Sequence, residues 1–523
     1  MTFWLRRRRV RYAYLAAGLA VLTTAATTAA LPASASADSA PSLLSAAPLG
    51  LNTAPWDYIY AADTSAGGGV DVIQPLLQAA GIGMLRYGGG SYADYYDWQT
   101  NTNIQNCLPD DATASFTSSC SSSDSLDFSQ FSQQARAIGA ESFVTVNYGS
   151  GTPAEAAAWV AQAKSTAGQG VALWEVGNET YGCWEVDNEL AGPPENFQGY
   201  TPNTYTTVNG VYENPTCPQV TQGDAAGTQT LATSYAVNAS QFLTAMKKAD
   251  PAAQIGVPWA FGSDVPGASV PDNTEWNNTV LRADGKNVGF VDAHYYPFSF
   301  GGSTGGANPT DQQVLQSLFQ VPALYRGIRT ELSAYDPRAS VVVGETGVSN
   351  NETTTVCTPA GALFAAGDVL SWLAAGAKSV DWWDMNNYGN TTGTCASPDY
   401  GLFTSSSPPV AETPYYGYLL ASVLARPHAL LGTLSTSAPS DVLAYQSLLP
   451  GGKIAVALIN ANTSAAQQVT FHAPLFGTLR TWSYSAGSQN AANSEIITGT
   501  APATSFAHGI TLPAESLTVL ETQ

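Results

Sequence analysis

The segment Leu173-Trp-Glu-Val-Gly-Asn-Glu179 is a short run of strand-forming residues that ends at a glycine, an asparagine and a glutamate. A second segment repeats this arrangement, because the valine-rich run 340–344 is followed directly by Glu345. Short apolar runs bounded by turn residues are typical of parallel strands buried on both faces. A carboxylate at the end of such a strand is costly unless it has a partner or a function.

On both sides of these two segments, short β-rich runs alternate with longer amphipathic ones. This alternation predicts a (β/α)8 TIM barrel, whose active site lies at the carboxyl ends of the strands. The predicted strands are 56–60, 83–87, 142–148, 173–176, 254–258, 290–295, 340–344 and 379–383. The predicted helices include 70–80, 129–138, 153–167, 228–248, 311–334 and 362–374.

From about Leu430 the pattern changes to short alternating β runs with Gly, Pro and Asn turns, and no helix of useful length follows. This pattern predicts an antiparallel β-sandwich after the barrel. The expected organisation is a signal peptide over 1–37, a catalytic barrel over 38–428 and the sandwich over 429–523. Residues 38–50 are a candidate extra strand of the sandwich.

The N-terminus has the pattern of a secretory signal peptide: clustered arginines, an apolar run over 12–22 and small residues up to Ala37. We therefore expect cleavage after Ala37 and an extracellular protein. An even number of cysteines in an exported chain favours disulfides. Sequence alone does not choose among the possible pairings, but each successive pair falls in one predicted loop. We favour Cys107–Cys120, Cys183–Cys217 and Cys357–Cys395.

The composition narrows the classes of partner. Charged residues make up 11%, and Lys+Arg 19 against Asp+Glu 40 gives a formal net charge of −21. Such a surface repels nucleic-acid phosphate and anionic lipid, so we expect neither a nucleic-acid nor a membrane partner. No Cys/His cluster suggests a zinc site, and we expect no metal and no cofactor.

Glu179 and Glu345 are the residues on which the chemistry depends. Two carboxylates that face each other across a barrel mouth fit the acid and the nucleophile of glycoside hydrolysis, one protonated and one ionised. Alternatively, each carboxylate pairs with a nearby cation. The chain has few cations to offer, and only Arg86 ends a predicted barrel strand, so we favour the catalytic interpretation.

These residues resemble a family. Gly-Asn-Glu at the fourth strand, with a glutamate ending the seventh, resembles the retaining glycoside hydrolases of clan A. Leu85-Arg-Tyr-Gly-Gly-Gly90 followed by Tyr96-Asp97-Trp98 resembles family 51 α-L-arabinofuranosidases. The resemblance implies that Glu179 is the general acid/base and Glu345 the nucleophile. It also implies that Asn178 binds the sugar 2-hydroxyl and that Arg86 lies beside Glu345 and keeps it ionised.

Further substrate-binding candidates surround these residues. By the clan's pattern, His294 faces inward and Tyr296 donates to the nucleophile, although a strand-end histidine is as often structural. Trp382 or its neighbour Trp383 would form a flat platform under a sugar ring, and we choose Trp382 although strand alternation does not decide between them. Asp97 and Trp98 belong to a tyrosine-rich loop that either binds saccharide or packs on itself.

The sequence thus predicts a secreted retaining glycoside hydrolase, arabinofuranosidase-like, that cleaves O-glycosidic bonds of oligo- or polysaccharides from plants or microbes. Two alternatives stay open. One is an endo-acting β-glycanase, a glucanase or xylanase, of the same clan. The other is a catalytically inactive carbohydrate-binding protein on the same scaffold.

Overall fold

The computed structural model divides the chain after Asp38 into two units, and the residues it describes all belong to the second, Ser39–Gln523. The expected signal peptide lies outside the described residues. Within the described part, no helix is long and apolar enough to cross a membrane. The described residues are 40–57, 69–103, 124–182, 185, 206–208, 211–213, 225–261, 274–298, 309–349, 354–386, 400–485 and 496–523.

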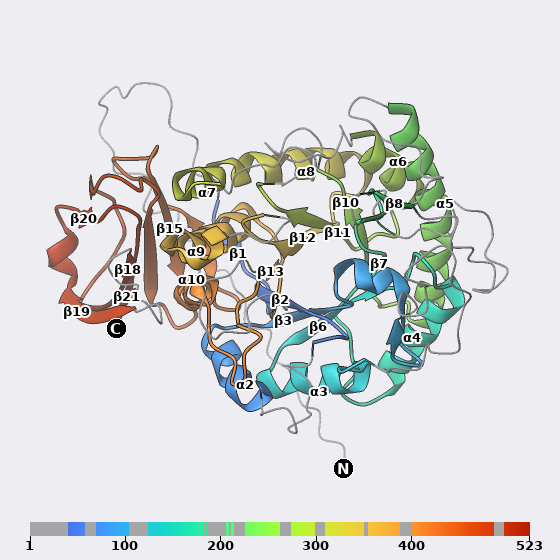
Figure 1. Cartoon of the computed structure of the whole chain (residues 1–523). Helices are drawn as coiled ribbons and strands as arrows, with labels where there is room; N and C mark the ends of the chain where they lie inside the picture. Colours follow the sequence, from blue (N-terminus) through green and yellow to red (C-terminus); the bar gives the residue numbers. More distant parts are fainter. Residues whose placement is uncertain are drawn as a thin grey trace, which may run out of the picture. The chain divides into compact units, whose positions relative to one another are not determined.

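Parallel strands close into a barrel (Figure 1), which confirms the predicted fold class. The strands follow one another around the barrel in chain order, and the last pairs with the first. They are β2 (Leu49–Thr53), β3 (Met84–Tyr87), β6 (Glu141–Val146), β7 (Leu173–Val176), β10 (Ile255–Trp259), β11 (Phe290–Tyr295), β12 (Ser340–Thr346) and β13 (Val380–Trp382).

The first barrel strand is β2, so the prediction of a strand at 56–60 was wrong. Trp56 lies in a turn after β2, and residues 58–60 lie outside the described residues. In β2, Leu49 and Leu51 are buried in the main hydrophobic core. Gly50 between them faces the Asp381 side chain, with which a Cβ at this position would collide. A strand with glycine and asparagine but no β-branched run has a weak sequence signal.

Helices surround the barrel (Figure 1). The predicted helix 311–334 is divided in two by a short 3-10 turn, and the sequence missed α6 and α10. The helices are α2 (Gly69–Ala79), α3 (Phe128–Ile138), α4 (Pro153–Ser165), α5 (Ala225–Ala249), α6 (Thr274–Asp284), α7 (Asp311–Ser317), α8 (Val321–Tyr335), α9 (Pro359–Ala375) and α10 (Thr413–Ala421).

The C-terminal strands form a seven-stranded antiparallel sheet with a two-stranded sheet packed against it, which confirms the predicted sandwich. β1, within the candidate segment 38–50, pairs with β14 at the edge of the large sheet. The large sheet has the order β1 (Ser42–Leu43), β14 (Leu430–Thr433), β15 (Val442–Leu448), β16 (Ile454–Asn460), β21 (Ser516–Thr522), β18 (Thr478–Ser485) and β19 (Ile497–Pro502), and the small one pairs β17 (Gln467–Val469) with β20 (Ile510–Leu512).

The sandwich is anchored to the barrel through α9, whose residues are buried almost all round. The hydroxyl groups of Ser371 on α9 and Tyr445 on β15 are hydrogen-bonded at 2.6 Å. Of the cysteines, the structure describes Cys357, which lies just before α9 and is not a free thiol. Cys107, Cys120, Cys183, Cys217 and Cys395 lie outside the described residues, so the disulfide pairings stay predictions.

Candidate active site

Glu179 and Glu345 lie at the carboxyl end of the barrel, after β7 and near the end of β12. Glu179 has a φ of 41°, in the left-handed region that non-glycine residues rarely adopt. Such backbone strain is concentrated at functional sites. One carboxylate oxygen of each glutamate and a ring nitrogen of His294 all lie within 4.8 Å of one another. The structure therefore brings the two sequence-predicted carboxylates together.

Arg86 of β3 lies at the centre of the site. Its guanidinium donates hydrogen bonds to Glu345 Oε1 at 2.7 Å and to Glu175 Oε2 at 2.8 Å. It also donates to the side-chain oxygens of Asn178, at 3.0 Å, and Asn52, at 2.9 Å. Burial disfavours the charge, but the carboxylates of Glu175, Glu345 and Asp292 outweigh it and raise the pKa of Arg86. This buried cation thus links β2, β3 and β7 to the nucleophile candidate on β12.

The Asn178 side chain is held at both ends. Its oxygen accepts from Arg86, and its Nδ2 donates to Glu185 Oε1 at 3.0 Å. Its backbone N–H donates to Asp94 Oδ2 at 3.1 Å. Burial, and then the nearby charges of Asp94 and Glu179, raise the pKa of Glu185 well above its usual range. An amide nitrogen carries two hydrogens, and among the described residues Nδ2 of Asn178 donates one of them, to Glu185.

His294 and Tyr296, at the end of β11, contact the glutamates directly. His294 Nδ1 lies 2.9 Å from Glu179 Oε1 and 3.4 Å from Glu345 Oε2. The Tyr296 hydroxyl donates to Glu345 Oε2 at 2.8 Å. Tyr181, which the sequence analysis did not single out, donates to Glu179 Oε1 at 3.0 Å. Burial disfavours charge on His294, but Glu345, Asp292 and Glu179 outweigh it and raise its pKa.

The choice of Trp382 as a sugar platform is corrected by the structure. Its ring is buried against Phe364 and Tyr418, and its indole N–H donates to the Tyr400 carbonyl at 2.8 Å. The neighbouring Trp383 is half-buried, and a Cβ built on Gly90 would lie 2.8 Å from its ring. Trp383 directly follows β13, and its ring lies beside Gly90, which follows β3, so Trp383 is the residue of the pair available to the barrel mouth.

Asp97 and Trp98 do not join this group either. Asp97 accepts from the Gln99 backbone N–H at 2.8 Å and from the Thr100 hydroxyl at 2.8 Å, which closes a local turn. Trp98 is buried and stacks on Trp159 of α4, with ring centroids 5.4 Å apart and an angle of 11°. The loop packs on its own scaffold, which was the alternative interpretation of its sequence.

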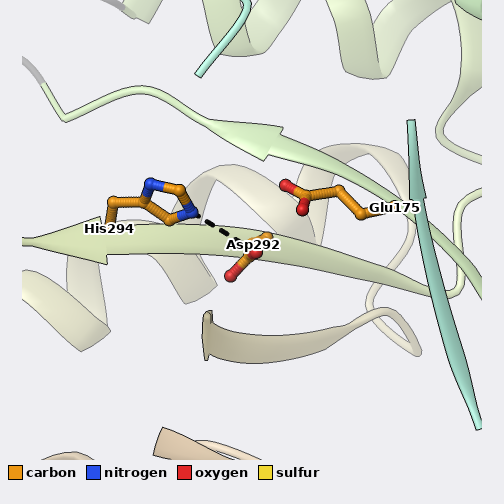
Figure 2. Close-up of side chains that lie close together, drawn as sticks. All are labelled: Glu175, Asp292 and His294. Carbon is orange, nitrogen blue, oxygen red and sulfur yellow. Dashed lines mark ion pairs between the residues drawn. The ribbon is translucent and has the colours of Figure 1, made fainter. Parts of the chain in front are cut away.

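Beneath the glutamates lies a second group of ionisable side chains, Glu175, Asp292 and His294 (Figure 2). Glu175 comes from β7 and points towards Asp292 and His294, which share β11. Burial, and then the charge of Asp292, raise the pKa of Glu175 to about 8. One carboxylate oxygen of Glu175, one of Asp292 and a ring nitrogen of His294 lie within 4.8 Å of one another, a spacing that a bound ion could bridge. Arg86, however, lies 2.8 Å from Glu175 and 3.6 Å from Asp292 and already supplies positive charge, so we assign no metal here.

Part of this group was accessible to sequence reasoning. Asp292 precedes His294 by two residues on one strand, so both side chains share a face. Glu175 lies on the predicted fourth strand, and it accepts from both Arg86 and Thr145. No comparable sequence pattern pointed to Tyr181, Asp94 or Asn52. The position of each in the site depends on a turn or on a neighbouring strand.

No protein-family model and no curated protein sequence matches the chain. Solved structures share its fold. An α-L-arabinofuranosidase from Thermotoga maritima, in complex with arabinose, has a TM-score of 0.65 and 15% identity over 92% of this chain and 98% of that one.

Two further structures extend this comparison. A family 51 α-L-arabinofuranosidase from Bifidobacterium longum has a TM-score of 0.63 and 16% identity over 93% of this chain and 98% of that one. A bifunctional glucanase–xylanase from a metagenome library has a TM-score of 0.56 and 14% identity over 92% and 96%. The barrel and the sandwich thus occur together in glycosidases of different specificity.

Proposed function

We propose that this protein is a secreted glycoside hydrolase that acts with retention of anomeric configuration. The observation that carries the proposal is the pair Glu179 and Glu345, whose nearest oxygens lie within 4.8 Å of each other. Retaining glycosidases have carboxyl groups ~5–5.5 Å apart, whereas inverting enzymes need ~6.5–9.5 Å to place a water molecule. The short oxygen–oxygen distance supports the retaining arrangement.

The surroundings of the two glutamates divide their roles. Glu345 accepts from Arg86 at one oxygen and from Tyr296 at the other, so its orientation is fixed. It is the nucleophile that attacks the anomeric carbon. Glu179, with a side chain 20% exposed at the mouth, protonates the leaving oxygen. It then deprotonates the water that hydrolyses the glycosyl-enzyme.

The other residues of the site fit a neutral sugar. Asn178, whose side chain is held by Arg86 and Glu185, is the residue we assign to the sugar 2-hydroxyl, a contact that strengthens in the transition state. Trp383 offers an aromatic face for the ring. The net charge of −21 disfavours a strongly anionic substrate. An α-L-arabinofuranoside is the first substrate to test, and extracellular action rests on the signal-peptide pattern of residues 1–37.

The test is hydrolysis of aryl α-L-arabinofuranoside, β-glucoside, β-xyloside and β-cellobioside, and of arabinan, xylan and β-glucan, by the wild type and Glu345→Gln. Glu141→Gln is the matched control, since Glu141 begins β6 at the opposite end of the barrel. We expect one sugar to be released by the wild type and the control and not by Glu345→Gln. Release from polymers alone would identify a β-glycanase. Glycan binding without any hydrolysis would contradict the proposal and identify a binding protein.

A further inference from the structure

Asp292 is a fully buried carboxylate that faces three groups around it. Its Oδ1 accepts the Gly344 backbone N–H at 2.6 Å. Its Oδ2 lies 3.5 Å from His294 Nε2, the ion pair drawn in Figure 2, and 3.6 Å from Arg86 Nε. Within the described residues, Oδ2 has no hydrogen-bond partner. Its interaction with the two cationic side chains is therefore one of charge.

Each of these three groups is adjacent in the chain to, or in direct contact with, one of the two glutamates. Gly344 directly precedes Glu345, and a Cβ at Gly344 would collide with the Asp292 carboxylate. Arg86 donates to Glu345 Oε1 at 2.7 Å. His294 uses its other ring nitrogen, Nδ1, to contact Glu179 Oε1 at 2.9 Å. Asp292 is thus one group removed from both glutamates.

We infer that Asp292 is a positioning residue. Its carboxylate fixes the orientations of His294 and Arg86, and these two side chains in turn position Glu179 and Glu345. The role in catalysis rests on the proposed function. A carboxylate at Nε2 keeps a proton on that nitrogen, which determines what Nδ1 presents to Glu179. The same carboxylate faces Nε of Arg86, while the terminal nitrogens of the guanidinium bind Glu345 and Glu175.

The charges around His294 come from several elements. Asp292 lies on its own strand, Glu175 on β7, Glu179 and Tyr181 follow β7, Glu345 lies on β12 and Arg86 on β3. Asp292→Asn removes one negative charge while keeping an oxygen that can accept from Gly344. It also turns an amide N–H towards two donors, Arg86 Nε and His294 Nε2. The charged imidazole is then less stable, and its contact with Glu179 loosens.

The first measurement is independent of hydrolysis. The chain has four histidines, so nitrogen NMR of the full-length protein labelled at histidine resolves each imidazole, and His294→Gln assigns the signal. We expect His294 to stay protonated to a higher pH than the other three. Asp292→Asn should move its titration to lower pH, and Asp284→Asn, at a buried carboxylate between α5 and α6, should not.

The second measurement uses the glycoside that the wild type hydrolyses. Asp292→Asn should lower kcat about 10- to 100-fold, the usual effect of removing a residue that orients a catalytic group, with little change in KM. Asp284→Asn should keep the wild-type rate. If the wild type hydrolyses nothing, the proposed function fails, and the NMR arm still decides whether Asp292 controls His294.

Two results would overturn the inference. One is a His294 titration that is the same in folded Asp292→Asn as in the wild type. The other, which needs no variant and so covers a failure of Asp292→Asn to fold, is a wild-type His294 that titrates together with His428, His472 and His508.

Discussion

The interior of the barrel beneath its mouth and the interior of the sandwich are built from opposite kinds of side chain. In the barrel, the fully buried Arg86 lies 2.8 Å from Glu175 and 3.6 Å from Asp292, which are fully buried as well. In the sandwich, the core between the two sheets is apolar, with Leu458 and Leu479 fully buried. Burying charge costs free energy even when the charges are paired, whereas burying leucine stabilises the fold.

The comparison indicates that the barrel mouth and the sandwich contribute differently to stability and to chemistry, although both belong to one compact unit. If the proposed function holds, the barrel mouth gives up stability to hold charges that the reaction uses, and we expect the sandwich, packed on α9, to contribute mainly stability. Substitutions in the two regions should therefore have separable effects. Changes at the mouth should alter rates with little loss of stability, and changes in the sandwich core should do the reverse.

The largest effect should follow Glu179→Gln, which removes the proton donor. We expect kcat/KM, which reports the step that forms the glycosyl-enzyme, to fall about 10²- to 10⁴-fold for glycosides with poor leaving groups, the usual contribution of a general acid. The loss should be much smaller for aryl glycosides whose leaving group needs no protonation. The melting temperature should change little, because the Glu179 side chain is 20% exposed and glutamine keeps an oxygen that can accept from Tyr181. An equal loss on both kinds of substrate would contradict the role of Glu179 as the acid.

In the sandwich, Leu458→Ala should lower the free energy of unfolding by about 2–5 kcal/mol, since it leaves a cavity in a packed core. Activity at 25 °C should stay at the wild-type level while the protein remains folded. Leu43→Ala is the matched control, because Leu43 on β1 is 69% exposed. Denaturant unfolding measures the stabilities. A fall in kcat of folded Leu458→Ala would break the division between the two regions.

The two neighbouring tryptophans of the eighth strand test the same division within one dipeptide. Trp383→Ala should raise KM about 3- to 10-fold, the value of one aromatic contact, and leave the melting temperature nearly unchanged. Trp382→Ala should instead destabilise the barrel by about 3–5 kcal/mol, since its ring is buried against Phe364 and Tyr418. Substrate kinetics and thermal unfolding of both variants make the comparison. If Trp382→Ala alone changed KM, Trp382 and not Trp383 would be the residue that contacts the sugar.

These tryptophans also show where sequence reasoning reaches its limit. The end of the eighth strand could be predicted from its apolar run, but which tryptophan faces the mouth depends on register. The pairing of β12 with β13 shifts between Val343 and Thr346, and such a shift leaves no trace in a pattern of apolar residues. Asp97 and Trp98 were misplaced for a related reason, because an aromatic loop looks alike whether it binds sugar or stacks on Trp159.

The elements predicted correctly have strong local signals. Glu179 and Glu345 each follow a valine-containing strand, and strand ends meet at one face of a parallel barrel. β2 was missed because Leu49-Gly-Leu-Asn-Thr53 has no β-branched run, and its glycine is explained only by Asp381 on the neighbouring strand. The buried contacts of Asp292 with Gly344, Arg86 and His294 depend on three strands at once. Such long-range placement is what a single sequence does not express.

The smallest effect is a pH dependence of stability that should arise mainly in the barrel, although burial also raises the pKa of Glu515 in the sandwich to about 7. Burial, opposed by a hydrogen bond from Ser379, raises the pKa of Asp381 from 3.8 to about 8. The folded protein thus holds this proton more tightly than the unfolded chain. The contribution of Asp381 to the free energy of unfolding is complete at pH values below 3.8, the pKa of an ordinary aspartate. It is lost as the pH rises through about 8, the pKa in the folded protein.

We therefore expect the melting temperature to fall between pH 5 and pH 9, and Asp381→Asn, which cannot ionise, to flatten that fall. The flattening should be partial, because burial also raises the pKa of Glu175 to about 8 and that of Asp368 to about 7. Leu458→Ala supplies the contrast: it should lower the melting temperature equally at both pH values, since no titrating group has changed. Scanning calorimetry measures all three proteins. A slope in Asp381→Asn as steep as in the wild type would locate the pH sensitivity elsewhere in the fold.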